Sequence, residues 1–140
     1  MKLRLAQNKD LKFIFNLYNQ NILEKNFFSK NKIQFNEHKN WFKKKIKEKR
    51  FFICFLKNKV GYVRFEKIDK NNLSVSIAVE KKYKRKGYGK KMLTKALNKK
   101  TISKFNVFAI IKSKNLISKK FFLNSGFKLV KKNQYMIKAK

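Results

Sequence analysis

The sequence predicts a single mixed α/β domain (residues 1–140) in which a mostly antiparallel sheet is flanked by helices. The chain is 140 residues long, which suits one hydrophobic core. Hydrophobic residues make up 43% of it and aromatic residues 15%, so there is enough apolar surface to close that core. Apolar residues switch along the chain between the period of strands and the period of helices, and no linker-like stretch interrupts them.

The N-terminal part is expected to form one strand and two helices. Apolar and polar residues alternate over 3–5, which indicates a short strand. Asn8 precedes apolar residues at helical spacing over 11–18 and is expected to cap the first helix. Residues 21–34 are Asn-rich and irregular, and a second helix is expected from Asn36 to Lys49.

The rest of the chain completes the order βααβββαβαββ. Two short turns join three apolar segments, which favours an antiparallel meander. The expected strands are 51–56, 60–68, 73–79, 105–111, 127–130 and 134–137, with helices over 87–99 and 115–124 and Gly126 at the end of the last helix.

The charge of the chain is strongly positive. Lys and Arg number 39 against 7 Asp and Glu, giving a formal net charge of +32. Only four of the basic residues are Arg, the type preferred for reading bases and phosphates, and Lys is spread over the whole length. Two interpretations stay open: a generally solvated basic surface, or attraction to polyanions. Weak non-specific binding of nucleic acid is expected under either.

Composition also excludes several classes of protein. One Cys allows no internal disulfide, and one His with one Cys cannot build a His- or Cys-rich zinc site. Carboxylates alone could still hold Mg²⁺, but no metal is expected. No apolar stretch approaches the roughly 20 residues that span a bilayer. We therefore expect a cytoplasmic protein without a membrane span. Cys54 lies inside an apolar strand and is expected in the core.

The segment after the third meander strand carries the clearest chemical signal. The strand ends at Val79, a basic loop with Gly87 and Gly89 follows, and an amphipathic helix begins. Glycines let an anion approach the backbone, and free amides at a helix start attract it. Lys84, Arg85, Lys86 and Lys90 add positive charge, so the loop is predicted to bind phosphate; the alternative is a plain tight turn before a helix.

Two stretches resemble the GNAT family of N-acetyltransferases. Lys84-x-x-Gly87-x-Gly89 is similar to the family's (Gln/Arg)-x-x-Gly-x-(Gly/Ala) signature for acetyl-CoA. The stretch from Phe108 through Asn115 to Gly126-Phe127 is similar to its strand–Asn–helix–Gly-Phe block. The resemblance implies the GNAT fold, acetyl-CoA as co-substrate, and transfer of an acetyl group to a primary amine.

The resemblance also implies how the donor would be held. The amides from Arg85 to Lys90, which include those of Lys86, Gly87, Tyr88 and Gly89, would bind the pyrophosphate. The segment Ile77-Ala78-Val79 would diverge from the 105–111 strand and pair with the pantetheine arm, which Asn115 would also contact. The Val79 amide would polarise the thioester carbonyl.

Two residues depart from the family pattern. Lys84 replaces the usual Gln or Arg, which keeps a charge but loses the planar hydrogen-bonding geometry. Phe122 stands where many relatives carry a Tyr that protonates the departing thiolate. Because Phe cannot donate a proton, the general acid is unassigned.

A narrower resemblance concerns the acceptor. The stretch from Ser29 to Phe42, followed by Gly61 to Phe65 and by Ser76-Ile77, is similar to acetyltransferases acting on nucleotide-linked amino sugars of pseudaminic and legionaminic acid synthesis. It implies that Trp41 stacks on a base or sugar, that His38 accepts a proton or binds phosphate, and that Arg64 meets a diphosphate. The alternatives are core packing for Trp41 and, for His38, either a surface position or a place behind the residues that contact the substrate.

A phosphorylated small-molecule amine is therefore the expected acceptor. The alternatives are a protein N-terminus, a ribosomal or tRNA site, or a non-catalytic module that binds CoA or RNA. Phe122 is the feature that favours a non-catalytic module.

Overall fold

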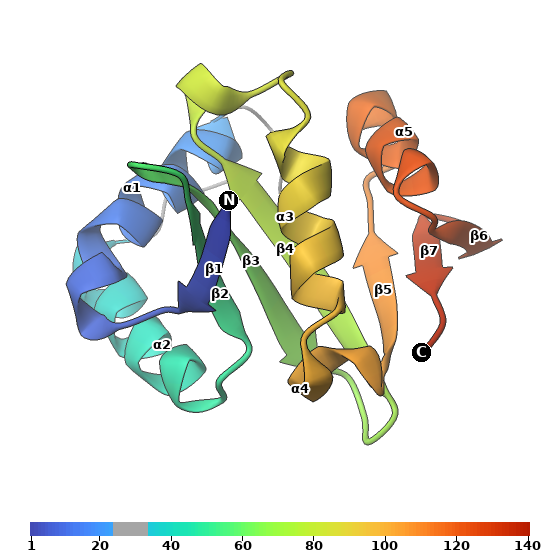
Figure 1. Cartoon of the computed structure of the whole chain (residues 1–140), viewed down its shortest axis with the longest axis horizontal. Helices are drawn as coiled ribbons and strands as arrows, with labels where there is room; N and C mark the ends of the chain where they lie inside the picture. The colour runs from blue at the N-terminus through green and yellow to red at the C-terminus, as the bar shows by residue number, and fades with distance from the viewer. Residues whose placement is uncertain (24–33) are drawn as a thin grey trace.

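The computed structural model describes residues 1–23 and 34–140, which build a seven-stranded sheet (Figure 1). The strands follow one another across it in the order β1-β2-β3-β4-β5-β7-β6. Only the β4–β5 pair is parallel. Their bounds are β1 Lys2–Leu5, β2 Phe51–Phe55, β3 Lys59–Lys67, β4 Asn72–Val79, β5 Asn106–Ile110, β6 Lys128–Lys131 and β7 Gln134–Ile137.

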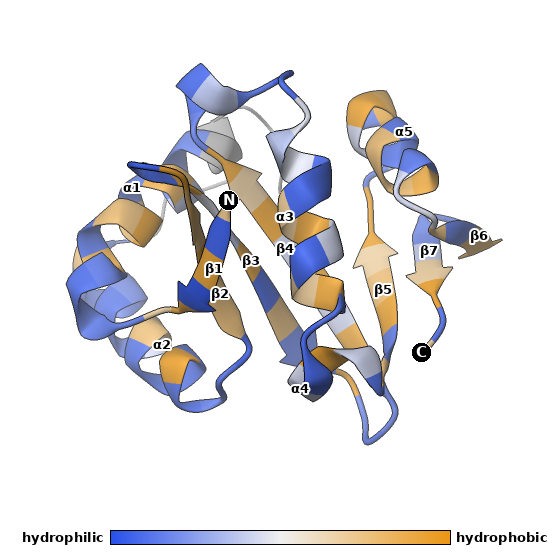
Figure 2. Ribbon diagram, viewed as in Figure 1, coloured by the Kyte–Doolittle hydropathy of each residue, from blue (hydrophilic) through white to orange (hydrophobic). Residues whose placement is uncertain are grey.

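Helices cover both faces of the sheet, and each face has its own apolar cluster. The smaller cluster packs α1 (Leu11–Leu23) and α2 (Phe35–Lys47) on β2 and β3. The larger one packs α3 (Tyr88–Leu97) and α5 (Leu116–Asn124) on the other face. In Figure 2 hydrophobic residues concentrate on the strands, whereas the segment between β4 and α3 is hydrophilic. The short helices η1 (Asn8–Asp10), η2 (Lys81–Tyr83) and α4 (Lys100–Ser103) complete the described chain.

The predicted fold class and the order of its main elements are confirmed, with differences at helix ends. Asn8 lies inside η1 and does not cap α1 directly. The second helix runs from Phe35 to Lys47 with Gln34 as its N-cap, whereas the prediction had Asn36 as the cap, two residues later, and Lys49 as the end. The short helix α4 was not predicted. Of the stretch predicted to be irregular, 21–23 belong to α1, and 24–33 lie outside the described residues.

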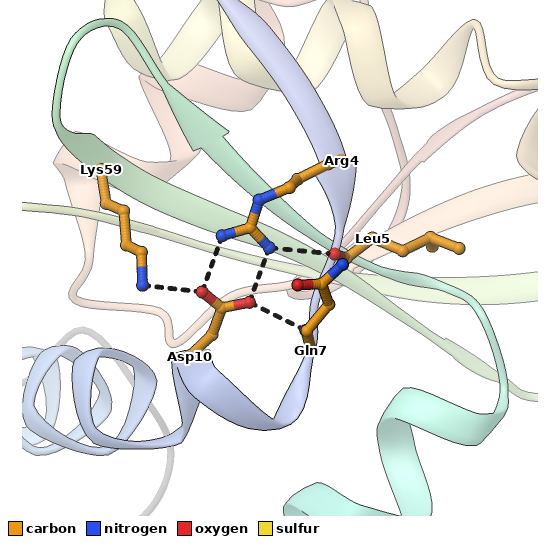
Figure 3. A network of polar contacts seen from close by, with 5 residues as sticks. All are labelled: Arg4, Leu5, Gln7, Asp10 and Lys59. Atoms are coloured by element: carbon orange, nitrogen blue, oxygen red, sulfur yellow. Dashed lines mark hydrogen bonds and ion pairs between the residues drawn. The ribbon is translucent and has the colours of Figure 1, made fainter.

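A buried carboxylate ties the start of the chain to the sheet (Figure 3). The Asp10 side chain is fully buried and accepts hydrogen bonds from Arg4 Nη1 at 2.7 Å and Nη2 at 2.9 Å. Lys59 Nζ lies 2.7 Å from the same carboxylate, and the Gln7 amide donates to it at 2.8 Å. Burial alone would raise the pKa of Asp10, but the bonds from Arg4 and Lys59 outweigh it and hold that pKa well below its ordinary value.

Replacing Asp10 by Asn is expected to lower the free energy of unfolding at pH 7 by about 2 to 3 kcal/mol, because two cations lose their buried partner. The pKa of Asp10 is depressed in the folded state, so its contribution is complete above pH of about 4 and is lost as pH falls through the folded pKa. Stability of Asp10→Asn should therefore vary less between pH 5 and pH 2 than that of the wild type. Urea unfolding at several pH values measures this.

Asp69→Asn is the matched control, since Asp69 is exposed and bonds only within its own turn, to Asn71 and Asn72. It should cost clearly less stability at pH 7 than Asp10→Asn. Equal losses in the two variants would contradict a structural role for the buried network.

The parallel pair β4–β5 opens into a fork. Its pairing begins at Asn72–Asn106 and ends at Ser74–Phe108, although β4 continues to Val79. Figure 1 shows the two strands side by side at their starts and apart at their ends. The divergence predicted for these two strands is therefore present, and it leaves a gap inside the sheet.

Candidate active site

A cavity of about 880 Å³ occupies the fork between β4 and β5. The segment between β4 and α3 closes one end of it, and α5 forms a side wall. Its lining includes the predicted residues Ile77, Val79, Lys84, Arg85, Gly87, Gly89, Lys90, Asn115 and Arg64. The cleft that a donor site requires is thus present where the sequence predicted it.

The cavity is lined from both faces of the sheet. Val75, Ile77 and Val79 belong to the apolar cluster under α3 and α5. Ser74 and Ser76 alternate with them and therefore point to the opposite face, the face that α1 and α2 cover. Arg64 pairs with Ser76 in the neighbouring strand and shares that face. The cavity consequently connects the two sides of the sheet through the fork.

The register of β4 leaves backbone groups facing the gap. Glu80 N–H donates to the Val60 carbonyl at 2.7 Å, so the hydrogen-bonded pairs with β3 fall on every second residue. By that alternation the peptide groups of Ala78 bond to Tyr62, and those of Ile77 and Val79 turn toward β5. Because β5 has moved away there, the amides of Ile77 and Val79 are directed into the cavity. Ala78 itself is buried on the α1 side of the sheet.

The loop before α3 presents a row of amides. On its two sides, Lys84 N–H bonds to the Lys81 carbonyl at 3.2 Å and Lys91 N–H to the Gly87 carbonyl at 3.4 Å. Between them, no backbone hydrogen bond within residues 1–23 and 34–140 occupies the amides from Arg85 to Lys90. Arg85 and Gly87 have positive φ, 61° and 80°. This left-handed geometry, with the free amides at the start of α3, suits an oxyanion such as phosphate.

The glycines of the loop serve different needs. Gly87 adopts the left-handed conformation as the N-cap of α3. At Gly89, an added Cβ would lie 3.1 Å from Phe121 Cε1 and 3.7 Å from Val79 Cγ2. The second glycine therefore permits a close approach between α3, β4 and α5. Lys86 and Tyr88 belong to the same loop but do not contribute to the described cavity wall.

Asn115 caps α5 at the edge of the cavity. Its Oδ1 accepts a hydrogen bond from the Ser118 amide at 3.1 Å. The carbonyl end of the side chain is therefore engaged, and the amide end can donate to a ligand. Phe122 lies nearer the C-terminal end of α5 and also lines the cavity, and only 6% of its surface is exposed.

His38 lies away from the cavity wall. It is fully buried, with ring centroids of Phe15 at 5.1 Å, Trp41 at 5.4 Å and Phe42 at 6.2 Å. Neither ring nitrogen has a hydrogen-bond partner within the described parts of the chain. Burial, and then the charge of Arg64, lower the pKa of His38 to about 4. The predicted direct contact between His38 and substrate is therefore not supported by this placement, and a surface position is excluded.

The single histidine of the chain makes this measurable. In a proton NMR titration, the His38 ring signal should have its midpoint near pH 4. Because the ordinary value is about 6.5, the unfolded chain binds more protons between these two values. Stability should therefore fall as pH decreases from about 6.5 to 4, and His38→Phe should remove that dependence. A midpoint at the ordinary value would contradict a neutral, buried ring.

Arg64 lines the cavity on the α1 side, and Trp41 packs against it from behind. The Arg64 guanidinium lies over the Trp41 ring at 5.0 Å from its centroid and bonds to Glu66, which Lys45 also approaches at 3.6 Å. Only 13% of the Arg64 side chain is exposed, and its Nε has no hydrogen-bond partner in the described structure. Trp41 packs at the border of the smaller cluster, outside the cavity wall. Lys45 also lies 3.5 Å from Glu48, so these two cations and two carboxylates balance one another. Of the four residues Arg64 is the one that lines the described cavity, and it gives the lining a positive charge on this side.

Several lining residues were not among the site residues that the sequence predicted. Strand alternation in 73–77 already separated serines from apolar residues, and this signal could have placed Ser74 and Ser76 opposite Val75. Tyr18 and Ile110 had no comparable signal, because only packing brings them to the fork. The residues concerned are Tyr18, Ser74, Val75, Ser76, Ala109, Ile110, Ser118 and Ser125.

Two further properties of the described residues bear on the chemistry. They contain no group of three His, Cys, Asp or Glu side chains that could hold a metal ion. Within them, no helix has the length and hydrophobicity needed to cross a membrane.

Comparison with known proteins identifies the family. Residues 1–128 match the acetyltransferase (GNAT) domain. The chain belongs to the GNAT acetyltransferase family. The predicted enzyme class is thereby confirmed, whereas the resemblance to enzymes of pseudaminic and legionaminic acid synthesis stays a prediction.

Solved structures similar to this GNAT chain agree in fold. An N-acetyltransferase from Staphylococcus aureus is 20% identical, with 99% of this chain and 98% of that one covered and a TM-score of 0.84. A phosphinothricin acetyltransferase from Sinorhizobium meliloti, in complex with acetyl-CoA, is 18% identical over 93% and 76%, with a TM-score of 0.80. A ribosomal-protein-alanine N-acetyltransferase from Brucella melitensis is 16% identical over 91% and 85%, also with a TM-score of 0.80. No curated protein sequence matches the chain.

Proposed function

We propose that this protein transfers an acetyl group from acetyl-CoA to the primary amine of a phosphorylated small molecule, a nucleotide-linked amino sugar. The observation that carries the proposal is the cavity through the fork, with a row of free amides at one end and Arg64 at the other. One end suits the diphosphate of a donor and the other suits an anionic acceptor.

The donor side follows from the loop and the open edge of β4. The amides from Arg85 to Lys90 bind the pyrophosphate, and Lys84, Arg85, Lys86 and Lys90 neutralise it. The Ile77 amide, the Val79 carbonyl and the side chain of Asn115 bind the pantetheine arm, which leaves the Val79 N–H for the thioester. One similar structure was solved in complex with acetyl-CoA, which supports this choice of donor.

The chain promotes the reaction by positioning and by polarising the thioester. Acetyl-CoA supplies an activated acyl carbon, and a neutral amine forms the new C–N bond as the C–S bond breaks. The Val79 amide, directed into the cavity, donates to the carbonyl oxygen where negative charge develops. In the described cavity wall there is no carboxylate and no imidazole, and Phe122 cannot donate. Tyr18 and Tyr83 also line the cavity, so a tyrosine hydroxyl or water protonates the thiolate, and the proton that the amine releases passes to water.

The acceptor side favours an anion over a polyamine. Glu66 does not line the described cavity, and it is already bonded to Arg64 and close to Lys45. An ammonium group of a polyamine would meet a positive wall there, whereas a phosphate can bind Arg64. Ser74 and Ser76 present hydroxyl groups at the same side, suited to the hydroxyls of a sugar.

A thiol-release assay tests the acceptor. The full chain is the enzyme, and the assay compares four kinds of acceptor: UDP- and CMP-linked amino sugars, the same sugars without phosphate, peptides and tRNA. Arg64→Gln should raise KM for the nucleotide-linked sugar about 10-fold to 100-fold, the loss expected for a charge-assisted bond, with little change for the unphosphorylated sugar. Arg50→Gln is the control, because Arg50 stacks on Phe105 outside the cavity.

Turnover only with peptides would discard the sugar proposal in favour of the second candidate, a ribosomal-protein N-terminus. The net charge of +32 favours that candidate, since it draws the protein to ribonucleoprotein. Similarity to the Brucella melitensis ribosomal-protein-alanine N-acetyltransferase is a further reason to include it. Binding of acetyl-CoA or RNA without any turnover would indicate a non-catalytic module.

A further inference from the structure

We infer that the donor site accepts acyl groups longer than acetyl, so that propionyl- and butyryl-CoA are donors as well. The structural basis is the closed end of the fork, where Val75 and Ala109 follow the last paired residues of β4 and β5 and, with Phe122, are buried apolar residues of the cavity lining. This part of the cavity is called here the acyl recess. The inference rests on the proposed seat of the donor diphosphate at the loop before α3. It does not depend on the identity of the acceptor.

Along β4, the acyl recess lies further from the loop before α3 than the thioester does. From the loop toward the closed end of the fork, the cavity wall passes Val79, then Ile77, then Val75. Alternate residues of a strand lie about 7 Å apart. A thioester carbonyl held by the Val79 or Ile77 amide therefore leaves at least one such interval before the strands close at Ser74. An acetyl group occupies only a small part of that interval.

The two faces of the fork separate an alkyl chain from the amine. Val75, Ala109 and Phe122 all belong to the apolar cluster under α3 and α5. Ser74, Ser76 and Arg64 line the opposite face. An alkyl chain gains by entering the apolar side, and a polar amine approaches from the other. A longer acyl chain consequently need not obstruct the attacking amine.

Two residue choices keep the acyl recess open and apolar. Ala109 has the smallest side chain on its face of β5. The larger Val107 precedes it on that face, and the larger Ile111 follows it just after the strand ends. Phe122 fills a wall position without the hydroxyl group that a tyrosine would bring. A buried hydroxyl without a partner would be unfavourable there, whereas a phenyl ring packs against an alkyl chain without that penalty.

The chemistry is unchanged by the longer chain. The amine nitrogen forms a bond to the acyl carbon, the carbon–sulfur bond breaks, and the released thiolate takes up a proton. The products are the longer amide and free CoA, and no further reactant is needed.

Equilibrium binding of CoA, acetyl-, propionyl- and butyryl-CoA to the full chain, without any acceptor, tests the inference. Transfer of one methylene to an apolar site is expected to lower Kd about fourfold, so butyryl-CoA should bind more than tenfold tighter than acetyl-CoA. Thiol release with the best acceptor should show the same preference: the kcat/KM for butyryl-CoA should be no lower than that for acetyl-CoA.

Matched variants test whether the acyl chain binds in the acyl recess. Ala109→Leu should fill the acyl recess and reverse the order, so that acetyl-CoA binds tighter than butyryl-CoA. Val75→Ile and Val107→Ile add the same methyl group on neighbouring strands, but only Val75 lines the cavity. Val75→Ile should reduce the preference for butyryl-CoA, and Val107→Ile should retain it. The Val75 and Val107 pair decides the matter if Ala109→Leu does not fold.

Equal or weaker binding of butyryl-CoA by the wild type would overturn the inference, as would the same chain-length order in Val75→Ile and Val107→Ile. Because binding is measured without acceptor, a chain-length preference with no turnover of any amino sugar would leave the inference intact and reject the proposed acceptor. No binding of any CoA compound would instead reject the donor site on which both rest.

Discussion

Replacing Gly87 by Val is expected to abolish the thermal stabilisation that acetyl-CoA gives the protein. Gly87 has a φ of 80°, a conformation that a β-branched residue avoids, so the loop must rearrange and its amides lose their common direction. For the wild type, acetyl-CoA at a hundred times its Kd should stabilise by about 2.7 kcal/mol, or roughly 10 °C in Tm. Differential scanning fluorimetry with and without the ligand measures both variants.

Gly126→Val is the matched control. Gly126 also has a positive φ, 95°, but it follows α5 and lies outside the loop. Its replacement should lower the Tm of the free protein through the same kind of strain and leave the ligand-induced shift in place. If Gly87→Val keeps the full shift, the diphosphate binds elsewhere.

Gly61→Ala is expected to be the most destabilising single methyl addition in the sheet. A Cβ at this position would lie 2.1 Å from the Ala78 carbonyl oxygen and 2.9 Å from Met92 Cε. The methionine can rotate away, but the carbonyl belongs to the paired strand, so β3 and β4 must separate next to Val79. The expected loss is about 3 kcal/mol of unfolding free energy, accompanied by a fall in kcat because the Val79 amide is displaced.

Urea unfolding gives the first quantity, and thiol release well below the Tm gives the second. Gly89→Ala provides the comparison, since its new Cβ meets the edge of the Phe121 ring at 3.1 Å and that ring can shift. It should cost clearly less stability than Gly61→Ala. A Gly61→Ala protein as stable and as active as the wild type would show that β3 and β4 separate there without moving the Val79 amide.

The site residues that local sequence could predict are those whose proposed role depends on the backbone. Lys84, Gly87, Gly89 and Asn115 are placed by local sequence, because a strand end, a glycine loop and a helix start form a binding loop by their own conformational preferences. Their positions around one cavity agree with that prediction. The acceptor side was harder to foresee, since it depends on which residues of α1, α2 and β3 meet across the sheet.

His38 and Trp41 illustrate the difference. Helical spacing correctly put them on adjacent turns of α2, but spacing does not say whether that face meets solvent, a ligand or other rings. In the structure, His38 is enclosed by aromatic rings, and Trp41 supports Arg64 from below the cavity wall. Arg64 is thus the one member of the three that reaches the cavity.

Sequence by itself determined the order of strands and helices, the anion-binding loop and the absence of a tyrosine hydroxyl at Phe122, because periodicity, glycine and residue identity act locally. Only the tertiary structure decided that β4 and β5 part after Ser74, that both faces of the sheet open into one cavity, and that His38 is sealed away from it. These features arise where strands and helices distant in sequence compete for the same space, and packing between them cannot be deduced from any one segment.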